Sequence, residues 1–187
     1  MYQASDLRKG LTVEIDGGPY VVTEFNFVKP GKGQALYVCK LKNMDTGATL
    51  QRTFRSADKI DEAHLDKRVL TYSYPDGEHF VFVDDKYEQI VLSRETLGDA
   101  AKFLLENIEV EFLFHRDKAV QVTLPTFVER QIVECEPGVR GDTATNVMKP
   151  AKIQGGHEIS VPLFVNNGDI VKIDTRTGEY VDRVRKK

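Results

Sequence analysis

The chain alternates hydrophobic and polar residues over many short segments, and this period of two predicts β-strands. In the first third of the chain, these segments cover residues 11–15, 20–28, 34–41 and 48–54. Two of them are long and are joined by a Pro- and Gly-rich stretch, residues 29–33. Long strands connected by such a tip predict a projecting β-hairpin.

The middle of the chain continues the strand pattern, with one exception. Four strands are expected, at residues 69–74, 79–83, 108–114 and 120–124. Between them a short helix is predicted over residues 97–106, because Ala100, Phe103 and Leu104 fall on one helical face. Thr96 and Asp99 have the spacing of a capping box at its start.

The last third also consists of short strands separated by turn residues. Five are expected, at residues 127–133, 145–153, 159–165, 170–174 and 180–184. Five strands in so short a stretch are typical of OB-type or SH3-like barrels. The whole chain therefore reads as all-β with three small units, residues 1–64, 65–126 and 127–187. Units of this size are marginal alone, so they are expected to pack on one another.

Charge gives different answers for the whole chain and for its parts. The 187 residues include 26 Lys and Arg against 29 Asp and Glu, and a net charge of −3 argues against a nucleic-acid partner. By segment, the net charge is +1 for residues 1–64, −5 for 65–127 and +1 for 128–187. Acidity is thus confined to the middle, and both ends carry basic residues that could meet phosphate.

Targeting and redox signals are absent from the sequence. No apolar run approaches the length of a membrane helix, and the N-terminus lacks the pattern of a signal peptide. Cys39 and Cys135 make no disulfide framework and are expected to be reduced, buried thiols. A cytoplasmic protein without a membrane partner is expected.

The hairpin tip carries the first candidate for chemistry. Pro30 fixes its own φ, whereas Gly31 and Gly33 permit positive φ, so Lys32 between them is expected to point outward. One interpretation is an ordinary solvated turn lysine. The other is a probe that brings a cation or a modified amine into a partner's cleft. The sequence is not a phosphate-binding P-loop, which needs a Gly-Lys-Ser/Thr motif that opens a helix.

A polar loop near residue 141 is the second candidate. Gly141, Asp142 and Thr143 present backbone N–H, carboxylate and hydroxyl groups that can bind riboses and base edges. An ordinary surface loop is the competing interpretation.

Catalytic and metal signatures are missing. The four histidines are scattered without metal-ligand spacing, and His157 receives no role. No catalytic residue, metal site or cofactor is therefore predicted. Five aromatic residues of the middle unit could form a base-stacking platform, but packing in the core and at its rim is favoured because this unit is acidic. They are Tyr72, Tyr74, Phe80, Phe82 and Tyr87.

Several motifs, in order and at fixed spacing, resemble the bacterial elongation factor P family over essentially the whole chain. They are Lys-Pro-Gly-Lys-Gly-Gln-Ala at 29–35, Tyr-Ser-Tyr-Pro-Asp-Gly at 72–77, Tyr-Glu-Gln at 87–89, Gly-Asp-Thr-Ala-Thr at 141–145, a spaced signature over 149–162, and Asp-Thr-Arg-Thr-Gly-Glu-Tyr at 174–180. The resemblance implies an SH3-like, KOW-type domain at 1–64 and OB domains at 65–126 and 127–187, in an L-shaped, tRNA-like molecule.

The resemblance also implies a non-enzymatic translation factor that binds both ribosomal subunits between the P and E sites. It would act when synthesis stalls at consecutive prolines. Lys32 would reach the CCA end of the P-site peptidyl-tRNA, and a lysine-modifying enzyme would extend it, with β-lysylation as the expected form. Supporting residues at the tip would be Lys29, Pro30, Gly31, Gly33 and Gln34. A monomer is expected.

For the third unit, the resemblance implies two RNA contacts. Gly141, Asp142 and Thr143 would face the small subunit and the E-site codon of the mRNA. Tyr180 and Arg183 would contact the tRNA body, by stacking and by phosphate binding. Asp182 is expected to compete for the Arg183 guanidinium.

Two other functions remain open. A generic OB-fold protein that binds single-stranded nucleic acid would show tight, salt-sensitive oligonucleotide binding without ribosomes. An enzyme using Lys32 or Cys39 would need a substrate pocket around that residue, whereas a Pro/Gly tip is convex.

Overall fold

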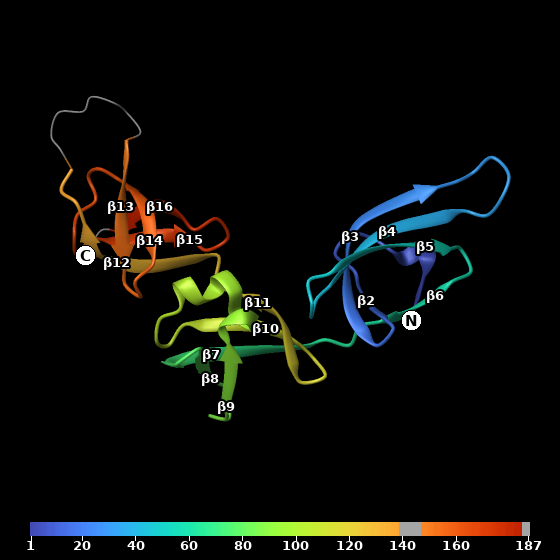
Figure 1. Ribbon diagram of the computed structural model, residues 1–187, viewed down its shortest axis with the longest axis horizontal. Coiled ribbons are helices and arrows are strands. Elements are labelled where there is room, and N and C mark those ends of the chain that lie inside the picture. Colours follow the sequence, from blue (N-terminus) through green and yellow to red (C-terminus); the bar gives the residue numbers. More distant parts are fainter. Residues whose placement is uncertain (139–146, 185–187) are drawn as a thin grey trace. The chain divides into compact units, whose positions relative to one another are not determined.

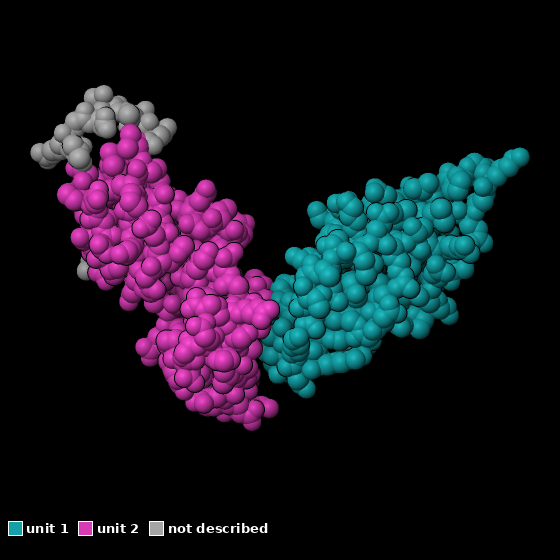
Figure 2. All heavy atoms as spheres, viewed as in Figure 1, with its two compact units in different colours: residues 1–68, 112–121 teal, residues 69–111, 122–187 magenta. Residues whose placement is uncertain are grey.

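The protein is described here by a computed structural model that covers residues 1–138 and 147–184 (Figure 1). The chain forms two compact units (Figure 2). Unit 1 contains residues 1–68 and 112–121, and unit 2 contains residues 69–111 and 122–187. The division into three domains at residues 64 and 126 stays a prediction.

The first sheet has six strands in the order β1-β6-β2-β3-β4-β5. Their bounds are β1 Tyr2–Gln3, β2 Thr12–Ile15, β3 Gly18–Val28, β4 Leu36–Asn43, β5 Thr49–Arg55 and β6 Lys59–Glu62, with a 3₁₀ turn at Ala4–Asp6. Val13, Val22, Cys39 and Leu41 are fully buried at its centre. Alternating apolar positions on β2, β3 and β4 supply this core, as the sequence predicted.

The second sheet has five strands in the order β11-β10-β7-β8-β9. Their bounds are β7 Asp66–Asp76, β8 His79–Val83, β9 Gln89–Ser93, β10 Glu109–His115 and β11 Lys118–Thr123. Leu70, Phe82, Val110 and Phe112 on these strands are fully buried. The tip of the β10–β11 hairpin belongs to unit 1, where Arg116 donates to Glu14 (3.1 Å) and Lys118 pairs with Asp45 (2.5 Å).

The third sheet also has five strands, in the order β14-β13-β12-β15-β16. Their bounds are β12 Phe127–Cys135, β13 Met148–Ile153, β14 Glu158–Pro162, β15 Ile170–Asp174 and β16 Glu179–Val184. Ile153, Val161, Val165, Val171 and Ile173 are completely buried. The all-β class and the strands predicted from alternation are confirmed, with ends shifted by a few residues, although residues 145 and 146 of one predicted strand lie outside the described residues. Short β1, β6 and β9 were missed.

The predicted helix over 97–106 is wrong in its bounds and its cap. The helical segment is α1, Arg94–Leu97, followed by a 3₁₀ helix, η2, Gly98–Phe103. Ser93 is the N-cap, since its hydroxyl accepts the Thr96 N–H at 3.2 Å. Gly98 ends the α-helix with φ +54°. Asp99 pairs with Lys102 at 2.7 Å instead of capping.

Within the described residues, no helix is long and apolar enough to cross a lipid bilayer.

Candidate functional site

The hairpin β3–β4 forms an arm whose connecting loop, residues 29–35, projects past the paired strands of its sheet (Figure 1). Its strands pair continuously from Tyr20 opposite Asn43 to Val28 opposite Leu36, with a bulge between Val22 and Glu24. The neighbouring strand β5 pairs only as far as Arg55, opposite Leu36. Residues 29–35 therefore form a loop past the last rung of the ladder.

The loop leaves Lys32 free to meet another molecule. Residues 29–34 are all exposed, and no hydrogen bond or ion pair joins the Lys32 side chain to the part of the chain that the structure describes. Gly33 has φ +132°, close to the ring of Pro30, whereas Gly31 does not adopt a positive φ. The outward lysine is thus confirmed, and only Gly33 uses the freedom expected of both glycines.

The base of the arm is held by side chains on both of its faces. Phe25 and Phe27 flank Tyr37, with ring centroids 6.1 and 5.2 Å from it. On the other face, Lys40 pairs with Glu24 at 2.9 Å. The ring contacts contribute most of the stabilisation of the arm, since an exposed ion pair is worth about 1 kcal/mol or less. These contacts therefore brace the two strands that carry the tip.

The two residues expected to contact the tRNA body lie on β16. Tyr180 is half-buried against the core of the third sheet, and burial, followed by Asp182, raises the pKa of its hydroxyl. The Arg183 guanidinium lies 3.5 Å from Asp169 and 5.1 Å from the centre of the Phe164 ring. Asp182 accepts the backbone N–H of Arg183 at 2.7 Å. The expected competition by Asp182 is wrong, because Asp169 is the carboxylate that the guanidinium meets.

Gly141, Asp142 and Thr143 lie outside the described residues, so their expected place at the E-site codon stays a prediction.

Neither cysteine lies in a setting that activates a thiol. Cys39 is fully buried, and desolvation raises the pKa of its thiol, which disfavours a thiolate nucleophile. Cys135 is only half-buried, with its thiol 3.7 Å from the Val165 carbonyl, so the expectation of burial is wrong for it. Among residues 1–138 and 147–184, no cluster of three or more His, Cys, Asp or Glu side chains could hold a metal ion.

The aromatic residues of the second sheet do not form an open stacking surface. Tyr72, Phe80 and Phe82 are buried, while Tyr74 and Tyr87 are exposed. Packing in the core and at its rim is therefore confirmed, which removes the main support for a generic single-strand binder.

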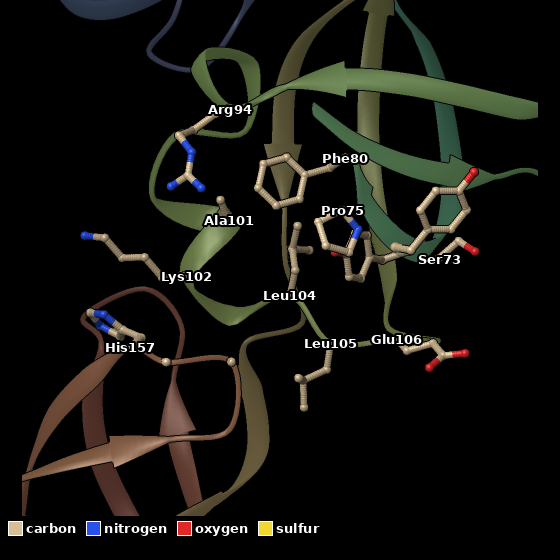
Figure 3. A pocket seen from close by; sticks show the side chains of 14 residues that line it. Ser73, Pro75, Phe80, Arg94, Ala101, Lys102, Leu104, Leu105, Glu106 and His157 are labelled. Atoms are coloured by element: carbon tan, nitrogen blue, oxygen red, sulfur yellow. The ribbon is translucent and has the colours of Figure 1, made fainter. Parts of the chain in front are cut away.

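An open depression of about 590 Å³ in unit 2 is lined by Phe80, Pro75 and Leu104, with Arg94, Lys102 and His157 to one side (Figure 3). The two cations, Arg94 and Lys102, already have partners. Arg94 lies 3.6 Å from Glu78, and Lys102 pairs with Asp99. The depression is therefore assigned no ligand.

Sequence reasoning missed two residues that join the segment η2 to the third sheet. His157 packs edge-on against the Phe103 ring, at 5.4 Å between centroids. Arg130 is 6% exposed, and its guanidinium donates to the carbonyls of Phe103 and Glu129. Desolvation lowers the pKa of this guanidinium. The burial of Arg130 could have been inferred only from the alternation along β12, since Arg130 lies between Val128 and Ile132 on the buried face of the strand.

The turn before β16 gives a pH-dependence that can be tested. Arg176 donates to both oxygens of Asp174, at 3.1 and 2.7 Å, and holds the pKa of that carboxyl at about 2. Because this pKa is depressed in the folded state, the stabilisation is present above the unfolded value of about 4 and is lost as pH falls toward 2. Asp174→Asn should therefore flatten the fall of stability across this window.

Urea midpoints measured from pH 7 to pH 2 test this expectation. Arg176→Ala should flatten the same window, because it removes the guanidinium from Asp174. Equal acid sensitivity of the three proteins would contradict the assignment.

Comparisons with known proteins fit this arrangement of sheets and arm. The elongation factor P KOW-like domain matches residues 3–60, the elongation factor P OB domain matches 65–122, and the elongation factor P C-terminal domain matches 128–183. The chain belongs to the elongation factor P family. The KOW-like and OB domains expected from the sequence are confirmed, and the chain is a translation elongation factor by family.

Relatives in the elongation factor P family match over nearly their whole length. Elongation factor P of Desulforapulum autotrophicum is 52% identical over 98% of this chain and 99% of its own, and that of Syntrophus aciditrophicus is 48% identical over 99% and 100%. A solved structure described as eukaryotic translation initiation factor 5A from Methanococcus jannaschii shares the fold, with a TM-score of 0.57 and 21% identity over 66% of this chain and 93% of that one.

Proposed function

We propose that this chain binds the ribosome between the P and E sites and promotes peptide bond formation where synthesis stalls, notably at consecutive prolines. Its Lys32 reaches the CCA end of the P-site peptidyl-tRNA. The observation that carries the proposal is the exposed Lys32, without a partner among the described residues, at the end of an arm braced by Phe25, Tyr37 and Phe27.

The physical contribution of the arm is orientation. A cation held at a fixed place can bind RNA phosphate and reduce the entropic cost of aligning a poor nucleophile with the peptidyl ester. No covalent step by the protein itself is needed. The factor works as a monomer in the cytoplasm.

Contacts at the other end of the chain would place the factor on the ribosome. Arg183 binds a tRNA phosphate after exchanging its 3.5 Å contact with Asp169, and Tyr180 lies beside it on β16. The exchange is feasible because the Arg183 side chain is 40% exposed. Gly141, Asp142 and Thr143 face the small subunit and the E-site codon.

Modification of Lys32 fits its exposure, since a modifying enzyme needs an unhindered amine. A β-lysyl group would lengthen the arm and keep positive charge near phosphate. In protein purified from its native host, the mass of the peptide that contains Lys32 should show the addition, and an unmodified Lys32 would contradict this part alone.

The decisive experiment compares Lys32→Ala with the unchanged protein in translation of a reporter that contains a run of prolines. Loss of the oriented cation should reduce relief of stalling by about tenfold or more. Lys9→Ala, which removes another exposed lysine of unit 1, should match the unchanged protein. A Lys32→Ala protein that relieves stalling fully would refute the mechanism.

A further inference from the structure

An aromatic row crosses the arm just behind the Lys32 loop. Phe27 on β3 lies directly opposite Tyr37 on β4, and Tyr37 lies opposite Phe54 on β5. Residues directly opposite in an antiparallel sheet share a face, so the three rings lie on the same side. Their exposure falls along the row, because Phe54 is 7% exposed and Phe27 is 53% exposed.

This row continues the hydrophobic core of the first sheet out into solvent. Phe25 and Tyr37 pack against that core, whereas Phe27 lies beyond it. Single exposed hydrophobic residues are ordinary. Phe27 differs because its ring is supported on one side by Tyr37, at 5.2 Å, and is open on the other. It also lies only five residues before Lys32.

The charges around the row favour an anionic partner. Residues 29–36 include two lysines and no acid, and the nearest preceding acid, Glu24, is already paired with Lys40. Arg52 lies over the ring of Phe54 at 5.9 Å but is also 3.9 Å from Asp16, so the cations without a partner among the described residues are Lys29 and Lys32. A flat apolar ring beside unopposed cations suits an unpaired nucleotide, whose base can stack while its phosphate meets a lysine.

We propose that Phe27 is a stacking platform for an unpaired base at the RNA end that Lys32 approaches, with Tyr37 as the positioning residue behind it. This inference rests on the proposed function and adds a second contact to it. The base is held by the ring, and the backbone that follows is held by the cation. Together the two contacts fix both the place and the direction of the nucleotide.

Three variants of Phe27 separate stacking from simple apolar contact in the proline-run translation assay. Phe27→Tyr keeps the ring and should retain activity. Phe27→Leu and Phe27→Ala should each lose at least about fivefold, because base stacking depends on the aromatic face. Thermal midpoints and the mass of modified Lys32 are measured for each, so that a folding or modification defect is recognised. Full activity of folded Phe27→Leu would overturn the proposal and would indicate an apolar protein contact.

A binding experiment tests the platform separately from translation. The chain has no tryptophan, so Phe27→Trp introduces a single tryptophan at the platform, whose emission can be excited apart from that of the tyrosines. The RNA trinucleotide CCA should quench its emission, and added salt should weaken the effect. Val28→Trp is the matched control, since Val28 is similarly exposed but alternates to the opposite face of the strand. It should not be quenched.

The two experiments distinguish failure of the inference from failure of the proposed function. If Lys32→Ala leaves translation unchanged, the proposed function fails. The fluorescence comparison alone then tests whether Phe27 stacks on a base. Equal response of Phe27→Trp and Val28→Trp to the trinucleotide would then overturn the inference.

Discussion

Replacing Phe103 by alanine is expected to lower the free energy of unfolding by about 3–5 kcal/mol, the usual cost of removing a buried aromatic ring. Phe103 ends η2, next to the second sheet, yet its ring lies in the core of the third sheet and is 4% exposed. Val128 and Ile132 belong to the same core, and His157 meets the ring edge-on. The alanine variant would leave a cavity where the OB domain is anchored to the C-terminal domain.

Urea denaturation followed by circular dichroism measures this effect. Phe164→Ala is the matched control, because the same side chain is 56% exposed there and should cost about 1 kcal/mol or less. Similar losses for the two variants would contradict the anchoring role of Phe103.

The second large effect is expected at Arg130, where Arg130→Ala should lower the free energy of unfolding by about 2–4 kcal/mol. The change removes a buried stem and leaves the carbonyl of Phe103 without its donor. Arg130→Met keeps most of the stem and removes a desolvated charge, so it should cost less, about 1–2 kcal/mol.

The comparison of alanine with methionine at this position separates packing from hydrogen bonding. It uses the same denaturation experiment. If methionine proves as costly as alanine, the donated hydrogen bond to Phe103 dominates. If neither variant is destabilised, Arg130 does not hold the junction.

Strands were predictable from sequence where one face is buried, because alternation then records the burial directly. The strands Thr12–Ile15 and Ile170–Asp174 are examples. The strand Lys59–Glu62 was not predictable, since only Ile60 within it is buried and its pairing with β1 and β2 depends on distant residues. The predicted first residue of the helix was wrong for a related reason. Ser93 and Thr96 are both good caps, and the bond from Arg94 N–H to the Glu78 carbonyl selects the first.

The candidate site likewise contains residues that could be predicted from the sequence and residues that could not. Lys32 was predictable because a Pro/Gly tip is a local signal. The aromatic row was not, because Phe27, Tyr37 and Phe54 come together only through the register of three strands. The pairing of Arg183 with Asp169 also depends on tertiary structure, whereas Asp182 was the nearer neighbour in sequence.

The membership of residues 112–121 in unit 1 has a consequence for how the molecule responds to a protease. The polypeptide passes from one unit to the other at three places, after residues 68, 111 and 121. Cleavage after Arg68 would cut the first link. Arg116 and Lys118 would nevertheless remain paired with Glu14 and Asp45 of the N-terminal fragment, residues 1–68. A nicked molecule should therefore stay assembled under native conditions, held by ion pairs that high salt would weaken.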